Sequence, residues 1–229
     1  MKTKFGAIIV DGSGKLGGHV VAKNRGGSYM RTKTTPINPQ SAHQTTIRNR
    51  MSVLSTGWGA LTQPQRDLWN KAVSAFKKTD IFGDIKSPSG FNLYVKLNCN
   101  LALVGVAAIV SPPSPIALPS FTTATLAAAT GAQTLALTYL PTPVPAGVAI
   151  VIECTPAMNP GKSFVKNDFR YVSKIAAAGA SPFAAGVAYI ARLGAIGSAG
   201  KVIWMRITTY SITTGQKGIP IVISAIIAA

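Results

Sequence analysis

Hydrophobic residues change their spacing twice along the 229-residue chain. Between residues 4 and 33, short β-forming segments are separated by glycine-rich turns, and from residue 38 to 101 apolar residues recur every three or four positions. Beyond residue 121 apolar residues alternate with polar or small ones. Because strands and helices have these periods, the sequence predicts an α+β N-terminal part followed by an all-β part.

The first segment is predicted to be a short antiparallel β-meander. Its strands are expected at residues 5–10, 16–22 and 28–32. The turns between them are expected at residues 11–14 and 24–27, which are rich in the Gly, Asn and Asp that tight turns favour.

Gly12, Gly14 and Gly17 also match the G-x-G-x-x-G pattern of dinucleotide-binding proteins. That site needs a helix directly after the glycines and an acidic residue about twenty positions later. Here β-forming residues follow, no acid occurs at residues 32–36, and Lys15 is not followed by the Ser or Thr of a P-loop. We interpret the motif as a hairpin turn.

Three helices are predicted next. Asn38 and Pro39 are expected to begin the first helix, Gly57 and Gly59 to end it, and its apolar face would hold Ile47, Met51, Leu54 and Trp58. A capping box at residues 62–65 predicts the second helix, with Leu68, Trp69, Ala72, Val73 and Phe76 as its stripe. A third helix is expected after residues 89–91, with Phe91, Tyr94, Val95 and Leu101 on one side.

The last part is predicted to be a β-sandwich. Prolines make residues 111–120 a stiff linker between an anchoring domain at 1–110 and a sandwich at 121–229. The candidate strands are residues 122–129, 133–139, 148–155, 169–175, 186–193, 201–211 and 218–228. About seven strands in roughly 110 residues are typical of immunoglobulin or fibronectin-like sandwiches. We expect the fibronectin-like form, with Trp204 as the core aromatic.

The net charge indicates which kind of partner the protein would bind. The chain has 23 Lys and Arg against 6 Asp and Glu, a formal charge of +17, and no block of five or six like charges. Such a field attracts polyanions and acidic protein surfaces. We favour a solvated surface that faces a partner over a dedicated nucleic-acid groove.

Membrane insertion and disulfides are not expected. The apolar run at residues 5–10 is too short for a signal peptide, and the longest run, 101–110, is too short to span a bilayer. Cys99 and Cys154 lack metal-site spacing, and we expect two small buried hydrophobic residues in a chain made in a reducing host cytoplasm.

The sequence also argues against an enzyme, a cofactor or a metal site. The carboxylates are Asp11, Asp67, Asp80, Asp84, Glu153 and Asp168, and all but Glu153 fall in or near turns, caps or exposed helix positions. His19 and His43 lie in different predicted elements. General acid–base catalysis needs such groups beside partners that tune their pKa, and the pattern indicates none.

The predicted helical hairpin is the segment that would bind nucleic acid. Its basic residues are Arg48, Arg50, Arg66, Lys71, Lys77 and Lys78, close to Trp58, Trp69 and Phe76. Aromatics among basic residues can stack bases, but both tryptophans fall on apolar stripes. We expect them in the core between the helices, with phosphate contact by the lysines and arginines left open.

A set of spaced motifs covers roughly residues 5–100. They are the run at 14–18, Lys23-Asn24, Gly27, Tyr29, Arg31, Pro36, Asn38-Pro39, Gln44, Arg48, Trp58, Leu61-Thr62, Gln65-Arg66, Trp69 and the run at 89–93. In these motifs the chain resembles a group of small virion proteins of tailed bacteriophages, including crAss-like phages of Bacteroidetes-type hosts. The resemblance implies a particle component carrying an immunoglobulin-like domain, with no catalytic residues.

The expected function is therefore a virion structural protein, first of all a capsid auxiliary or decoration protein. Its partners would be the major capsid protein or portal and tail components, and other copies of itself. The docking residues are expected to be Lys15, Lys23, Arg25, Tyr29 and Arg31, at the turns and strand ends of the meander. The alternatives are a portal or tail connector, ring or fibre-base component and, in another class, a basic protein that contacts DNA phosphates of the packaged genome.

Overall fold

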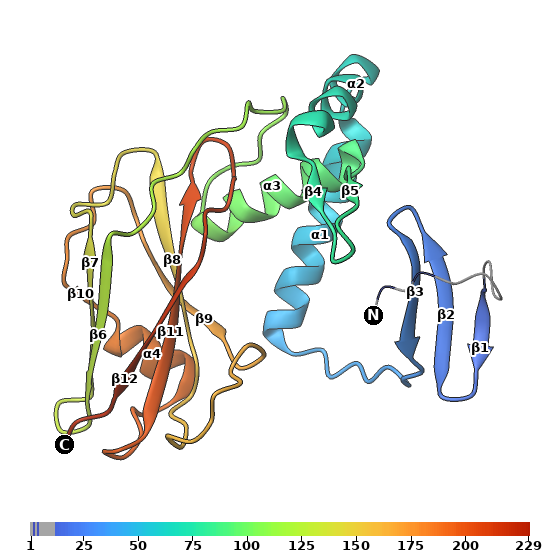
Figure 1. The fold of residues 1–229 in the computed structure, drawn as a ribbon. Helices are drawn as coiled ribbons and strands as arrows, with labels where there is room; N and C mark the ends of the chain where they lie inside the picture. Colours follow the sequence, from blue (N-terminus) through green and yellow to red (C-terminus); the bar gives the residue numbers. More distant parts are fainter. Residues whose placement is uncertain (1, 3, 5–11) are drawn as a thin grey trace.

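The N-terminal sheet lies at one side of the molecule, beyond the helices (Figure 1). The computed structural model describes residues 2, 4 and 12–229. Strands β1 (Gly14–Leu16), β2 (His19–Asn24) and β3 (Gly27–Thr32) form an antiparallel sheet in that order. The predicted strand at 16–22 was wrong in its bounds, because Gly17, with a φ of 55°, makes a hairpin turn inside it. The strand predicted at 5–10 lies outside the described residues.

Helix α1 (Ala42–Ala60) begins later and ends later than predicted. Ser41 caps it by accepting a hydrogen bond at Oγ from the Gln44 N–H (3.4 Å), so the predicted start at Asn38 and Pro39 was wrong. Gly57 and Gly59 lie inside the helix rather than ending it. An added Cβ at Gly57 would lie 2.9 Å from the Tyr94 hydroxyl, so this glycine allows the close approach of α3 (Gly90–Val104).

The other predicted helices are confirmed. The Gln65 side chain accepts from the Thr62 N–H (2.9 Å) at the start of α2 (Gln63–Ala72), which continues into the short 3₁₀ helix η1 (Val73–Phe76). Helix α3 ends at Gly105, with a φ of 77°. Trp69 is completely buried and packs edge-on against Tyr94, as the core interpretation expected. The small β4–β5 hairpin (Lys78–Thr79, Ile85–Lys86) lies between α2 and α3 in the chain.

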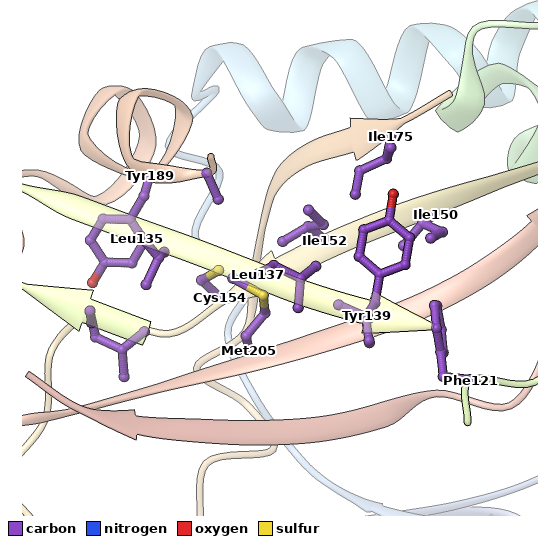
Figure 2. Close-up of a cluster of buried hydrophobic side chains, with 14 of the residues drawn as sticks. Phe121, Leu135, Leu137, Tyr139, Ile150, Ile152, Cys154, Ile175, Tyr189 and Met205 are labelled. Atoms are coloured by element: carbon purple, nitrogen blue, oxygen red, sulfur yellow. The ribbon is translucent and has the colours of Figure 1, made fainter. Parts of the chain in front are cut away.

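Two further antiparallel sheets form the C-terminal part. One has the order β10-β7-β6, with bounds Phe183–Ala184, Thr134–Leu140 and Thr123–Ala129. The other has the order β12-β11-β8-β9, with bounds Ile221–Ile226, Val202–Ser211, Val148–Cys154 and Arg170–Ile175. Figure 2 shows the core formed by both, with Leu137 and Tyr139 of β7 beside Ile150 and Ile152 of β8. The described chain is therefore a mixed α+β structure.

One predicted strand was wrong: residues 186–193 form helix α4 (Gly186–Leu193). Val187, Tyr189 and Ala191 alternate with other residues as in a strand, but only Tyr189 of the three is buried. Gly186, Tyr189 and Leu193 are spaced by three and four positions, which is a helical stripe toward the core. Gly186 suits this contact because an added Cβ would meet the backbone of residue 133 at 2.8 Å.

Trp204 is not the core aromatic that the sequence predicted. The buried residues on the core face of β11 are Ile203, Met205 and Ile207, so the alternation is displaced by one residue. Trp204 and Arg206 lie on the opposite face, where the Arg206 Nε donates to Glu153 Oε2 (2.6 Å). In the core between the two C-terminal sheets, the largest fully buried side chains are Tyr139 and Tyr189 instead.

The C-terminal end of α3 packs on the four-stranded sheet. Val104 lies in a small apolar cluster with Ala149, Val151 and Tyr210. Its carbonyl accepts from Lys174 Nζ (2.5 Å). Along the proline-rich segment, the Ile116 N–H donates to Gln216 Oε1 (2.8 Å). Helices and sheets are therefore joined by apolar contacts and by hydrogen bonds far apart in the sequence.

Candidate functional site

The predicted docking residues do not form one cluster. In the β1–β3 sheet, Lys15 pairs with Val20 and Val20 with Arg31, so the three lie in one row across the strands. Tyr29 is two residues from Arg31 on β3, and side chains two apart point to the same face. Lys15, Tyr29 and Arg31 therefore share one face, which we call the meander face.

Lys23 and Arg25 lie elsewhere. Lys23 is opposite Ser28 in the register, one position out of phase with Tyr29, so it points to the other side of the sheet. Arg25 is in the two-residue turn between β2 and β3. The five residues are close in the chain, but strand register separates them.

Arg25 instead reaches a second basic region that the sequence analysis did not assemble. It lines a cavity of about 470 Å³ with Lys78, Lys86 and Lys96. An adjoining cavity of about 640 Å³ is lined by Lys78, Lys96 and Lys217, and both cavities share Phe76. We call the two cavities together the basic groove. No sequence signal joins Lys78, Lys96 and Lys217, because only the tertiary packing brings them together.

Among the described residues, one carboxylate lies near a lysine of the groove, and the others are engaged elsewhere. Asp80 accepts from Lys2 (3.2 Å), Asp84 pairs with Lys4 (3.1 Å) and lies 3.8 Å from Lys86, and Asp168 pairs with Lys162 (2.8 Å). Glu153 is held by Arg206, and Asp67 accepts from the Gln63 amide (2.9 Å). No described carboxylate lines either cavity of the groove, so its positive charge is left for a partner.

Catalytic groups do not converge within the part of the chain that the structure describes. It contains no group of three or more His, Cys, Asp or Glu placed to hold a metal. Cys99 and Cys154 are both free. Burial, with the nearby Glu153 charge, raises the pKa of Cys154 to about 12, and burial also raises the pKa of Cys99. Since the thiolate is the reactive form, neither is an activated nucleophile.

The glycine motif contains a hairpin turn, as expected, but the prediction of a turn at residues 11–14 was wrong for Gly14, because this residue lies in a strand and the turn is at Gly17. Gly14 belongs to β1, Gly17 makes the turn, and the chain continues as strand β2 from His19. The motif is thus followed by a strand, whereas a phosphate cradle requires a helix N-terminus at that point.

Within residues 2, 4 and 12–229, no helix is long and apolar enough to cross a membrane.

Comparisons with known proteins do not assign a family. No family model matches the chain, and no curated protein matches it in sequence. Among solved structures, it is similar to a β-1,2-glucanase from Parabacteroides distasonis, with 14% identity and a TM-score of 0.29. The match covers 51% of this chain and only 14% of the glucanase. A likeness this weak carries no argument about fold or activity.

Proposed function

We propose that this chain is a non-enzymatic structural protein of a tailed-bacteriophage particle, first of all a capsid auxiliary or decoration protein. The observation that carries the proposal is the excess of basic side chains: residues 1–110 hold 15 basic and 4 acidic side chains. Asp80 and Asp84 pair with Lys2 and Lys4, and Asp67 accepts from Gln63, so most of the basic side chains are left without a described carboxylate. A surface of this kind complements an acidic protein lattice.

The virion assignment rests on the motif resemblance over roughly residues 5–100, from which we infer that the docking part belongs to a particle component. On this proposal the meander face contacts the acidic partner. Lys15 and Arg31 supply charge, and Tyr29 supplies a rigid amphipathic ring of the type enriched at protein interfaces.

The C-terminal part is proposed to be an immunoglobulin or fibronectin-like sandwich that projects from the lattice or bridges neighbouring subunits. In the three-stranded sheet, β6, β7 and β10 would correspond to strands A, B and E of such a sandwich. In the four-stranded sheet, β8, β9, β11 and β12 would correspond to strands C, C′, F and G. Ala129 also pairs in parallel with Ala228, which links the first and last strands of the two sheets. This strand order supports the proposal, with α4 inserted between β10 and β11.

The charge of +17 also favours a second function, binding of packaged DNA. Salt separates the two, because a protein that neutralises several phosphates loses affinity steeply as salt rises. Docking on a protein surface depends instead on particular residue contacts. The positions of the charges therefore matter more for docking than their number.

Charge reversal tests the meander face. The variant Lys15→Glu/Arg31→Glu is produced during infection, and its copies per purified particle are counted by quantitative mass spectrometry. The matched control is Lys166→Glu/Arg192→Glu, which makes the same change of net charge at exposed positions of the C-terminal part. We expect incorporation to fall about tenfold or more in the first variant and little in the second, since like charge placed at an interface costs several kcal/mol. Normal incorporation of the first variant, or equal loss in both, would overturn this docking role.

A further inference from the structure

The basic groove is a built feature of the tertiary structure rather than a chance gathering of flexible side chains. Phe76 and Lys78 come from η1 and β4, and Lys96 comes from α3. The opposite wall is made by residues 116–118 and 216–220. Elements from both halves of the chain therefore enclose it.

Hydrogen bonds hold these walls in place. The Asn100 side chain of α3 donates to the Gly215 carbonyl (2.7 Å), next to the wall at 216–220. Gln216 accepts from the Ile116 N–H and so joins the two segments of that wall. Gly215 has a φ of 68°, and an added Cβ would overlap the Leu97 carbonyl of α3. The walls are therefore pre-organised, which lowers the entropy cost of binding.

The groove concentrates positive charge, and no described carboxylate lines either of its cavities. Lys78 and Lys96 are both exposed, but the surrounding protein partly desolvates Lys96 and lowers its pKa, and the neighbouring Lys78 ammonium lowers it further. Two cations held together in this way are stabilised by an anion placed between them. Of the five basic residues of the groove, only Lys86 has a described carboxylate within 4 Å, the 3.8 Å contact with Asp84. Among the described residues, Lys78, Lys96 and Lys217 thus have no carboxylate within 4 Å, and an acidic ligand would supply one.

The remaining lining restricts the chemistry of that ligand. The larger cavity is also lined by apolar residues, namely Phe76, Leu97, Ile116, Ala117, Leu118, Ile219 and Pro220. Ile219 is 80% exposed. The basic residues of this cavity are all lysines, which lack the planar fork of arginine, and Phe76 is its single aromatic. Stacking of successive bases needs several aromatic faces, so the lining suits aliphatic side chains with carboxylates better than a nucleic-acid strand.

We propose that the basic groove binds an extended acidic segment of a partner protein. Its Asp or Glu carboxylates contact Lys78, Lys96 and Lys217, and its aliphatic side chains fill the apolar part of the larger cavity. The smaller cavity, with Arg25 and Lys86, extends the same track for further acidic residues. This site is separate from the meander face, and it stands whether or not the chain belongs to a virion.

The test measures fluorescence anisotropy with the purified full-length chain near physiological ionic strength. The probe is a short fluorescein-labelled peptide in which Glu alternates with Leu. A peptide with Gln in place of Glu keeps the apolar side chains without the charge, and a labelled single-stranded oligonucleotide supplies phosphates. The variant is Lys78→Gln/Lys96→Gln, and the matched control is Lys166→Gln/Arg192→Gln, which removes two charges from positions that line neither cavity. Thermal unfolding of both variants checks that each is folded before binding is compared.

We expect saturable binding of the Glu–Leu peptide, weakened about tenfold or more by Lys78→Gln/Lys96→Gln and little by the control. All four positions are exposed, but only Lys78 and Lys96 line the groove and would contact the bound carboxylates. The unaltered chain should bind the Gln–Leu peptide no more tightly than the Lys78→Gln/Lys96→Gln variant binds the Glu–Leu peptide. The proposal is overturned if both variants weaken binding equally, which would indicate diffuse charge attraction, or if no saturable binding occurs. Tighter, groove-dependent binding of the oligonucleotide would also overturn it and identify the groove as a nucleic-acid site.

Discussion

Gly57 and Gly59 lie two residues apart in α1 but have different surroundings. An added Cβ at Gly59 meets nothing within 4 Å, whereas at Gly57 it lies 2.9 Å from the Tyr94 hydroxyl. The Tyr94 ring is fixed because it packs against Trp58 and Trp69, with ring centroids 5.5 and 5.3 Å away. Glycine at position 57 is therefore a packing requirement, although its sequence signal is that of a helix end.

We expect Gly59→Ala to raise the free energy of unfolding by about 0.5–1 kcal/mol, the usual gain from replacing glycine within a helix. Gly57→Ala should lower it, because overpacking of about 1–3 kcal/mol outweighs that gain. Urea unfolding followed by circular dichroism measures both. Equal stabilisation by the two substitutions would show that α1 and α3 are not in the close contact described.

The same residue scale explains which parts of the candidate site could be predicted. Lys15, Tyr29 and Arg31 could be grouped from the sequence because they lie close together in a segment whose strands and turns are visible there, and the register puts them on one face. The register puts Lys23 on the other face, because a shift of one residue reverses the direction of a side chain. The lysines of the groove come from residues 78, 96 and 217, and no local pattern predicts their meeting.

At the scale of elements, α4 is where local pattern and tertiary packing disagree. Its eight residues contain Val187, Tyr189 and Ala191 in alternation, which favours a strand, yet Val187 is 86% exposed and Tyr189 1%. The Tyr189 hydroxyl donates to the Thr155 carbonyl (3.1 Å), which fixes the helix against the end of β8. A segment this short carries too little periodicity to distinguish the two structures.

Paired alanine substitutions distinguish a helix from a strand at this position. Tyr189→Ala should lower the free energy of unfolding by about 3–5 kcal/mol, as for other large buried aromatics. Val187→Ala should change it by less than about 0.5 kcal/mol, since it alters an exposed helix position. Thermal or urea unfolding of both variants measures this. A loss of similar size in both would mean that the two side chains share a buried face, as in a strand.

The longer elements were predictable because their patterns are long and their ends carry local chemistry. The capping box that begins at Thr62 indicated the start of α2. In β11 the strand was found but not its buried face, because Trp204 and Met205 are both apolar and hydropathy alone does not choose between adjacent positions. Packing against β7 and β8 makes that choice.

At the scale of the whole molecule, the contact between α3 and the four-stranded sheet decides whether the two halves act as one body. Gly215 is central to it, because its backbone lies against the Leu97 carbonyl of α3 and accepts from Asn100. Gly200 provides a comparison, since it also has a positive φ, 83°, but no atom within 4 Å of an added Cβ.

We expect Gly200→Ala to cost about 1–2 kcal/mol of unfolding free energy, the penalty of the left-handed backbone. Gly215→Ala should cost about 1–3 kcal/mol more, because the Cβ also forces α3 away from the sheet. It should also weaken binding in the basic groove, whose walls adjoin Gly215. Urea unfolding and the peptide-binding assay measure the two effects, and identical behaviour of the two variants would contradict this account of the junction.

The central claim is that the basic surface docks the chain on an acidic protein lattice. The most direct measurement is co-sedimentation of the purified chain with DNA-free heads of the phage that encodes it, with double-stranded DNA as a parallel ligand over a series of salt concentrations. The account predicts saturable binding to heads that persists at physiological salt, with a stoichiometry of many copies for a decoration protein or one ring for a connector. Binding to DNA alone, lost steeply as salt rises, would contradict it and assign the positive charge to the packaged genome.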